Sequence, residues 1–178
     1  MVRKRLVQVY TGNGKGKTTA SLGLAMRAVG HGLKVYMIQF LKGNGKKGNF
    51  YGELNLAKEI PNLTIVQFGR PVWLDKHTID EEDLIRARKG LMHAKEIISS
   101  KEYDIVILDE INVAMDYGLI DVKEVMDLIK NKPEEVEIVL TGRYAPEEII
   151  KIADLVTEMR NIKHPYEKGI KSRKGIDR

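Results

Sequence analysis

Thr11-Gly-Asn-Gly-Lys-Gly-Lys-Thr-Thr19 is the stretch that decides the fold of this 178-residue chain. It follows the apolar run Leu6–Tyr10 and leads into Thr18–Val29, which is apolar almost all round and predicts a buried helix. A glycine-rich turn between a buried strand and a helix is the context of a phosphate-binding loop. The stretch therefore predicts a P-loop that binds a polyphosphate, although Thr11 stands where the usual pattern has glycine.

The loop offers several kinds of contact to a polyphosphate. Its glycines allow backbone N–H groups to turn inward around phosphate oxygens, and the helix that follows points its positive end at the anion. Lys17 adds a positive charge, and the Thr18 hydroxyl is a ligand for Mg²⁺ or Mn²⁺. We assign nucleotide binding to the loop and to a lysine after the next predicted strand: Gly12, Asn13, Gly14, Lys15, Gly16, Lys17, Thr18, Thr19 and Lys42.

Apolar runs alternate with helix-period segments along the rest of the chain. The further predicted strands are Val35–Phe40, Leu63–Phe68, Asp104–Leu108, Val136–Leu140 and Leu155–Glu158. The further predicted helices are residues 80–100, with Thr78 and Glu81 at the spacing of a capping box, residues 122–129 and residues 146–153. Continuous Val/Ile/Leu runs are typical of strands covered on both faces. The order predicts an α/β fold, a mostly parallel sheet flanked by helices, in one domain over residues 1–178 with a less regular basic tail at 161–178.

Acidic and basic side chains follow two of the predicted strands. Asp109 and Glu110 come directly after one, and Arg143 follows the next. Because the carboxyl ends of parallel strands line the ligand crevice, we expect all three beside the loop. Asp109 or Glu110 can then hold Mg²⁺ together with Thr18, and Arg143 can pair with phosphate oxygens. Glu110 has a second interpretation, in which it polarises the attacking water of an ATPase.

Composition excludes several classes of protein. The chain has no cysteine, so disulfide scaffolds, thiolate metal sites and cysteine nucleophiles are excluded. No apolar stretch approaches the length of a membrane span, and the first residues lack the pattern of a signal peptide, so we expect a cytoplasmic protein. The net charge of +5 is unevenly spread: residues 1–50 carry ten basic and no acidic side chains, residues 51–159 carry a net charge of −10, and residues 160–178 one of +5. This division indicates a localised anion site rather than a uniform basic surface.

Taken together, the motifs occur in an order that resembles the P-loop ATP:corrinoid adenosyltransferases, from about Leu6 to the end of the chain. The motifs that carry the resemblance are residues 11–19, Gln39-Phe-Leu-Lys-Gly43, Leu108-Asp-Glu110 with Tyr117-Gly118, Thr141-Gly-Arg143, Ala153-Asp-Leu-Val-Thr-Glu158, and Lys163-His-Pro165 followed by Lys174-Gly-Ile176.

The resemblance implies a RecA-like fold, in a homodimer, that binds Mg·ATP with its terminal phosphate at the loop. It implies transfer of the 5′-deoxyadenosyl group to the cobalt of a reduced Co(I) corrinoid, with release of triphosphate and with a reducing protein or flavin as electron donor. Carried over by position, Lys17, Arg143 and Glu110 are the candidate catalytic residues. Trp73, an aromatic surface suited to a flat ligand, would face the corrinoid.

The sequence departs from the family in two places. Members often carry a long polar N-terminal extension that helps to cover the active site of the other subunit, whereas here about five residues precede the first predicted strand. A second aromatic residue known before the tryptophan in some relatives is replaced, since Pro71 and Val72 stand there.

Two other functions fit part of the pattern. A RecA-like ATPase would use Glu110 to activate water and would act with nucleic acid or a protein partner. A binding module would attach its basic tail to nucleic acid, but Tyr166 is the only aromatic side chain between residues 160 and 178, so base stacking is poorly supported there. Adenosyl transfer is therefore the leading prediction, and nucleic acid is not expected as a partner.

Overall fold

A computed structural model describes residues 5–43, 51–72 and 74–177. Within these residues, six strands form one sheet in the order β3-β2-β4-β5-β1-β6, and every neighbouring pair is parallel. The strands are β1 (Val7–Thr11), β2 (Val35–Phe40), β3 (Leu63–Phe68), β4 (Ile105–Asp109), β5 (Glu137–Thr141) and β6 (Leu155–Glu158). The predicted α/β fold is confirmed, and each predicted strand lies within one residue of its observed bounds.

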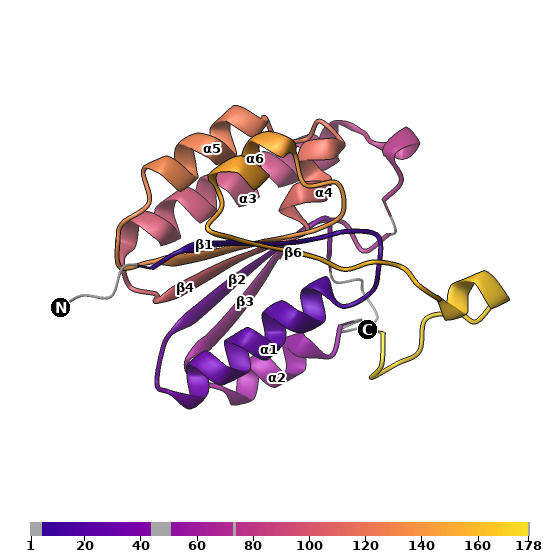
Figure 1. Cartoon of the computed structure of the whole chain (residues 1–178), viewed down its shortest axis with the longest axis horizontal. Coiled ribbons are helices and arrows are strands. Elements are labelled where there is room, and N and C mark those ends of the chain that lie inside the picture. Colours follow the sequence, from indigo (N-terminus) through magenta and orange to yellow (C-terminus); the bar gives the residue numbers. More distant parts are fainter. Residues whose placement is uncertain (1–4, 44–50, 73, 178) are drawn as a thin grey trace.

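Helices cover both faces of the sheet, as Figure 1 shows. They are α1 (Lys17–Gly30), α2 (Glu53–Glu59), α3 (Glu81–Ser100), α4 (Ile111–Asp116), α5 (Val122–Lys130) and α6 (Glu147–Ile152), with single 3-10 turns η1 (Lys76–Thr78) and η2 (Pro165–Lys168). In Figure 1, α1 and α2 lie below the sheet and α3, α4, α5 and α6 lie above it. This layering follows from the alternation of strands and helices along the chain.

Two apolar cores result, one on each face of the sheet. The neighbouring residues Met37 and Ile38 of β2 are both fully buried but belong to different cores, because successive side chains of a strand point to opposite faces. Ile38 packs with Leu91 of α3, and Met37 packs with Ala25 of α1. The continuous apolar runs of the sequence are therefore strands that fill two cores at once.

The helix α1 is less buried than its sequence indicates. It packs on the sheet through Ser21, Ala25 and Ala28, which are all buried, whereas Met26 on its outer face is 49% exposed. Small side chains bring the helix axis close to the sheet, so only a narrow stripe of the helix is covered. The expectation of a helix buried all round is wrong for the single chain.

The beginning of α3 also differs from the prediction. Its N-cap is Asp80, whose carboxylate accepts a hydrogen bond from the backbone N–H of Asp83 at 3.1 Å. Thr78 instead belongs to a capping box with Asp75 around η1. Aspartate is a strong N-cap residue, so the helix begins after Asp80. The short helices α2 and α4 were not predicted, because six or seven residues are too few for a clear period.

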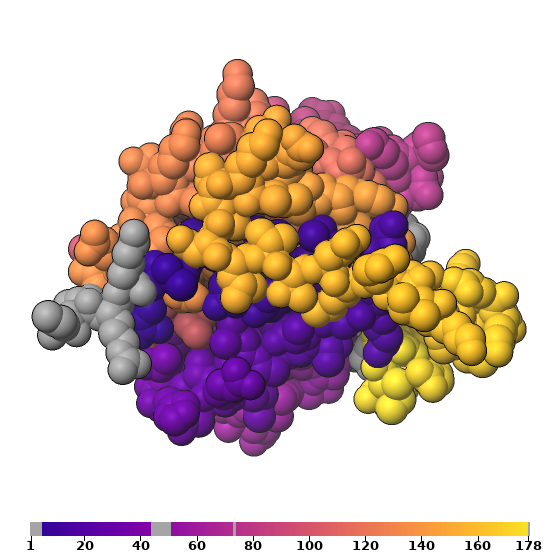
Figure 2. Space-filling model, viewed as in Figure 1, coloured from indigo at the N-terminus to yellow at the C-terminus, as the bar shows by residue number. Residues whose placement is uncertain are grey.

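The chain after β6 leaves the sheet and folds back toward the phosphate loop. In Figures 1 and 2 it crosses the face in front of β1, extends outward with η2, and then turns back toward the beginning of α1. A hydrogen bond of 3.0 Å from Lys15 Nζ to the carbonyl oxygen of Ile176 fixes this return. No helix in the described part of the chain is long and apolar enough to cross a membrane.

Candidate active site

The phosphate loop joins β1 to α1, with Lys17 as the first residue of the helix. The Lys17 ammonium donates hydrogen bonds of 2.8 Å to the carbonyl oxygens of Gly12 and Gly14, so the side chain lies back across its own loop. Burial lowers the pKa of Lys17, and the positive charge of Arg143 acts in the same direction, while the carboxylates of Glu110 and Asp109 oppose them. A lysine that is held by loop carbonyls and partly desolvated is ready to exchange those contacts for phosphate oxygens.

Two glycines of the loop are required by the segment that packs against it. A Cβ atom on Gly12 would lie 2.5 Å from the carbonyl oxygen of Met159, and one on Gly14 would lie 2.6 Å from that of Arg160. Gly12 also has a φ of +94°, which favours glycine. The Gly14 N–H donates a 2.6 Å hydrogen bond to the Met159 carbonyl oxygen. The exit of β6 is thus bonded directly to the loop.

Asp109 is the centre of the polar network beneath the loop. It ends β4, its side chain is fully buried, and it accepts hydrogen bonds from four side chains. The donors are Thr18 Oγ1 at 2.9 Å, Thr141 Oγ1 at 2.7 Å, Lys42 Nζ at 2.6 Å and Gln39 Nε2 at 3.3 Å. The buried carboxylate is therefore paired with donors on both of its oxygen atoms, as a buried polar group requires.

Lys42 is the cationic partner of Asp109. Its ammonium lies 3.3 Å from Thr18 Oγ1 and 5.4 Å from the centre of the Tyr51 ring. Burial alone would lower the pKa of Lys42, but the carboxylates of Asp109 and Glu110 and the hydrogen bond to Asp109 outweigh it and raise the pKa. The ammonium is therefore charged at neutral pH and forms a largely buried ion pair.

Glu110 occupies an unusual backbone conformation between β4 and α4. Its φ is 64°, in the left-handed region, and its N–H donates to Thr141 Oγ1 at 3.0 Å. Burial and the neighbouring charge of Asp109 raise the pKa of Glu110, against the lowering influence of Lys42, Lys17 and Arg143. A left-handed backbone and a raised pKa in the same residue are features typical of functional sites.

The structure brings most of the predicted site residues to one end of the sheet. Lys17, Thr18, Lys42, Asp109 and Glu110 form the network described above. The loop residues Asn13 and Thr19 are exposed, and Arg143 follows β5 with an exposed side chain whose charge acts on Lys17 and Glu110. Trp73 lies outside the described residues.

Lys15 differs from the other loop residues because it binds the C-terminal tail. Its ammonium forms an ion pair of 3.3 Å with Asp177, whose carboxylate also accepts hydrogen bonds of 3.0 Å from the backbone N–H and Nε of Arg173. These contacts, first those from Arg173 and then that from Lys15, hold the pKa of Asp177 well below its usual range. The tail is thus attached to the loop by a charged cluster.

Three residues of the network were given no role at the site in the sequence analysis, although two of them, Gln39 and Thr141, lie in its quoted motifs. Thr141, Gln39 and Glu53 extend the network, since Gln39 Nε2 also donates to Glu53 Oε1 at 3.0 Å. A polar Gln39 inside the apolar run of β2, fully buried, was a sign that could have been used, because buried polar groups require partners. Nothing in the local sequence places Glu53 beside Gln39.

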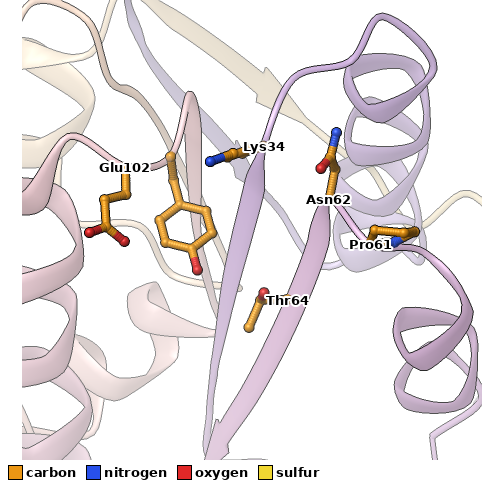
Figure 3. A pocket seen from close by; sticks show the side chains of 6 residues that line it. Lys34, Pro61, Asn62, Thr64 and Glu102 are labelled. Carbon is orange, nitrogen blue, oxygen red and sulfur yellow. The ribbon is translucent and has the colours of Figure 1, made fainter.

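Two hollows lie outside this network. One of about 380 Å³ lies next to the loop and is lined by Asn13 of the loop, Tyr144 from the segment between β5 and α6, Val156 of β6 and their neighbours. The other, of about 170 Å³, lies at the opposite end of the sheet, where Lys34, Asn62 and Thr64 precede or begin β2 and β3 (Figure 3). The second hollow is remote from the phosphate loop and takes no part in the site around Asp109.

The oxygen atoms at the network fit a Mg²⁺ ion. Thr18 Oγ1 and Asp109 Oδ1 are 2.9 Å apart, so a hydroxyl and a carboxylate converge on one point beside the loop. Mg²⁺ prefers oxygen ligands and is usually bound by one or two carboxylates together with substrate phosphates. Among the described residues no group of three or more His, Cys, Asp or Glu converges on one point.

The fold and the site define a nucleotide-binding protein of the P-loop class. A parallel sheet, a glycine-rich loop after β1, and a hydroxyl and a carboxylate that converge beside it are the parts that this class requires. The chain belongs to the family of ATP:corrinoid adenosyltransferases BtuR/CobO/CobP, whose family model matches residues 3–177. It is therefore an enzyme that adenosylates corrinoids with ATP, and the predicted activity is confirmed.

Relatives with this activity resemble the chain over nearly its whole length. A corrinoid adenosyltransferase of a Sinorhizobium species is 40% identical over 98% of this chain and 80% of that protein. A corrinoid adenosyltransferase of Escherichia coli K12 is 36% identical over 97% of this chain and 85% of that protein. Among solved structures, the flagellar accessory protein FlaH of Methanocaldococcus jannaschii has a TM-score of 0.62 at 16% identity, covering 88% of this chain and 72% of FlaH. The likeness to FlaH concerns the fold alone.

Proposed function

We propose that the phosphate loop binds the triphosphate of ATP as a leaving group while the cobalt of a Co(I) corrinoid attacks the 5′-carbon. A cobalt–carbon bond then forms, the bond between the 5′-carbon and the phosphate oxygen breaks, and inorganic triphosphate leaves with the bonding electron pair. The observation that supports this most is the Thr18–Asp109 contact of 2.9 Å directly beneath the loop. It creates a cation site beside the group whose negative charge grows.

The described side chains suit a reaction that needs charge stabilisation and no general base. Lys17 and loop N–H groups would contact the phosphates, and Arg143 adds a further positive charge at the same sheet edge. Preorganised donors that face a developing negative charge lower the barrier most. Because cobalt is itself the nucleophile, Glu110 has no proton to remove, and its role is to support the metal site.

Mg²⁺ or Mn²⁺ would be held by Thr18 and Asp109, with Glu110 close by. When bound, the ion supplies Lewis-acid neutralisation of the phosphate oxygens. Asp109 is positioned for this by Thr141, which donates to the same Oδ1 atom as Thr18 does. The remaining ligands would come from the phosphates and from water.

Product analysis tests this assignment. With Mg·ATP and a chemically reduced corrinoid, we expect an alkyl–cobalt absorption spectrum and one triphosphate per adenosyl group transferred. Lys17→Ala should weaken ATP binding by roughly 10- to 150-fold, since each hydrogen bond from a charged group contributes about 1.5–3 kcal/mol. Release of ADP and phosphate at the same rate with and without corrinoid would instead support the ATPase that Glu110 could serve.

The enzyme also needs a source of electrons. Co(II) must gain one electron to become the Co(I) nucleophile, so we propose a reducing protein or a flavin as donor. ATP as substrate supports action in the cytoplasm. Adenosylation that proceeds with reduced flavin, but not with oxidised flavin, would support this donor.

We further propose that the protein is a homodimer and that β6 contributes to its interface. Among the described strands β6 pairs only with β1, and its residues Leu155 and Val156 are 42% and 41% exposed although they point to opposite faces. An open apolar strand edge invites pairing with another chain. Light scattering should show that Leu155→Lys converts dimers to monomers, whereas Ile85→Lys on the exposed face of α3 should not. Equal masses for both variants and the wild type would exclude this edge.

A further inference from the structure

A lysine ammonium lies where the structure brings the two proposed metal ligands together. Lys42 Nζ is 2.6 Å from Asp109 Oδ2 and 3.3 Å from Thr18 Oγ1. The side chain of Asp109 is fully buried and that of Lys42 is 14% exposed. The buried carboxylate thus has a cation from the chain itself before any metal is considered.

Lys42 and a divalent cation compete for the same two side chains, the Thr18 hydroxyl and the Asp109 carboxylate. Mg²⁺ binds oxygen ligands at about 2.0–2.1 Å, and it requires lone pairs that point at the ion. An ion at that distance from Thr18 Oγ1 and the Asp109 carboxylate would meet the Lys42 ammonium, which is also positive. The metal can therefore bind both ligands only after Lys42 has moved away from them.

The backbone of Lys42 is fixed, so this movement belongs to the side chain. Leu41 has a φ of 60°, and the Gly69 N–H donates a 2.8 Å hydrogen bond to the Lys42 carbonyl oxygen. A Cβ atom on Gly43 would lie 2.3 Å from the Gly69 carbonyl oxygen, so the ends of β2 and β3 are in close contact at this point. A long flexible side chain on an anchored backbone can swing its ammonium without disturbing the sheet.

A triphosphate gives the displaced ammonium a new partner. Both members of the Asp109–Lys42 pair contact the hydroxyl of Thr18, which is the second residue of α1 and lies at the helix end next to the phosphate loop. Moving Lys42 to solvent would leave part of its charge unpaired, whereas moving it to phosphate oxygens keeps it paired. The exchange is therefore favourable when metal and triphosphate arrive together and unfavourable when the metal arrives alone.

We propose that the Lys42 ammonium occupies the metal site in place of a metal ion. It keeps free divalent cations out until a triphosphate binds and its oxygen atoms become the new partners of the ammonium. Lys42 is then a positioning residue in the empty site and a phosphate ligand in the loaded one. This inference rests on the proposed metal site at Thr18 and Asp109. It predicts that the same substitution has opposite effects on two ligands.

Binding of Mn²⁺ without nucleotide, followed by electron paramagnetic resonance of the free ion, gives the direct test. We expect Lys42→Met to bind Mn²⁺ at least about tenfold more tightly than the wild type, because the competing ammonium has gone. Lys34→Met is the matched control, since it removes the same charge just before β2, at the opposite end of that strand (Figure 3). The control should bind Mn²⁺ as the wild type does.

Calorimetry with the complex of Mn²⁺ and inorganic triphosphate gives the second arm. Here Lys42→Met should bind about tenfold more weakly than the wild type, because one phosphate contact is lost. An unchanged Mn²⁺ affinity in Lys42→Met, or a loss of affinity for both ligands, would overturn the inference. If Lys42→Met does not fold by circular dichroism, Lys42→Gln, which keeps a donor for Asp109 without the charge, is subject to the same two criteria.

The variant Asp109→Asn separates this inference from the metal site on which it rests. It should abolish the gain of Mn²⁺ affinity when combined with Lys42→Met, and alone it should weaken binding of the Mn²⁺–triphosphate complex. No effect of Asp109→Asn on that complex would remove the proposed metal site altogether. An effect of Asp109→Asn together with an unchanged Lys42→Met would retain the metal site and reject the role of Lys42.

Discussion

Asp109 shows how a single buried carboxylate organises the residues around it. A charge that is removed from water must be paired and hydrogen-bonded, or its burial opposes folding. Lys42 provides the charge, and Thr18, Thr141 and Gln39 provide neutral donors from other elements. Hydrogen bonds to Asp109 therefore connect the loop, β2, β4 and β5 at this end of the sheet. The same carboxylate is proposed to hold the metal.

A substitution at Thr141 measures how much the hydrogen bonds to Asp109 contribute to stability, without altering a charge. Thr141→Val keeps the shape but removes the donor to Asp109 Oδ1 and the acceptor for the Glu110 N–H. We expect the free energy of unfolding to fall by about 1–3 kcal/mol, the cost of leaving a buried polar group without its partner. Urea unfolding measures the change. Thr157→Val, on the exposed strand β6, should change stability by less than about 0.5 kcal/mol, and equal losses in both variants would contradict the argument.

At the scale of the elements, the sequence predicted what is local and missed what depends on neighbours in space. The loop at residues 11–19 and the acidic end of β4 could be predicted, because each is a short motif beside an apolar strand. The part played by Thr141 could not, since it depends on β5 lying next to β4, which an alternation of strands and helices does not specify. The contact between Gln39 and Glu53 depends in the same way on a seven-residue helix with too few turns to show a period.

The close contact between the phosphate loop and the residues that follow β6, Met159 and Arg160, supports a second prediction. A methyl group on Gly14 would lie 2.6 Å from the carbonyl oxygen of Arg160, which is backbone and cannot rotate away. We expect Gly14→Ala to lower the free energy of unfolding by about 1–3 kcal/mol, as overpacking usually does, and to weaken the hydrogen bond to Met159. Thermal unfolding and tryptic cleavage after Arg160 measure the two effects.

Gly23→Ala is the control for this substitution. Gly23 lies within α1, and among the described residues a methyl group added to it would meet no atom of another element within 4 Å. Alanine is favoured over glycine inside a helix, so this variant should gain up to about 1 kcal/mol. Gly14 and Gly23 should therefore respond in opposite directions. A loss of stability in both would show that the α1 backbone, rather than the contact with Arg160, limits what the loop tolerates.

At the scale of the whole molecule, the two basic ends of the chain lie in contact with each other. The acid-free first fifty residues contain the loop, and the basic tail returns to that loop through Asp177, one of two acidic residues among the last nineteen. The tail has few apolar side chains to bury, and those at Ile162, Ile170 and Ile176 are largely exposed. Charged contacts at its far end, together with the Met159 hydrogen bond at its beginning, therefore determine how it lies on the molecule.

Asp177→Asn should release the far end of the tail. The carboxylate contacts Lys15 and Arg173, both on the surface, so their attraction is screened by salt. At low ionic strength we expect tryptic cleavage after Lys168 and Lys171 to be several-fold faster in the variant than in the wild type. Salt should accelerate cleavage of the wild type toward the rate of the variant and leave the variant little changed. Asp116→Asn, which breaks a partly exposed ion pair with Lys76, controls for the loss of a charge. Cleavage that is equally slow in Asp177→Asn and the wild type at every salt concentration would show that the tail is held by its backbone contacts and not by this cluster.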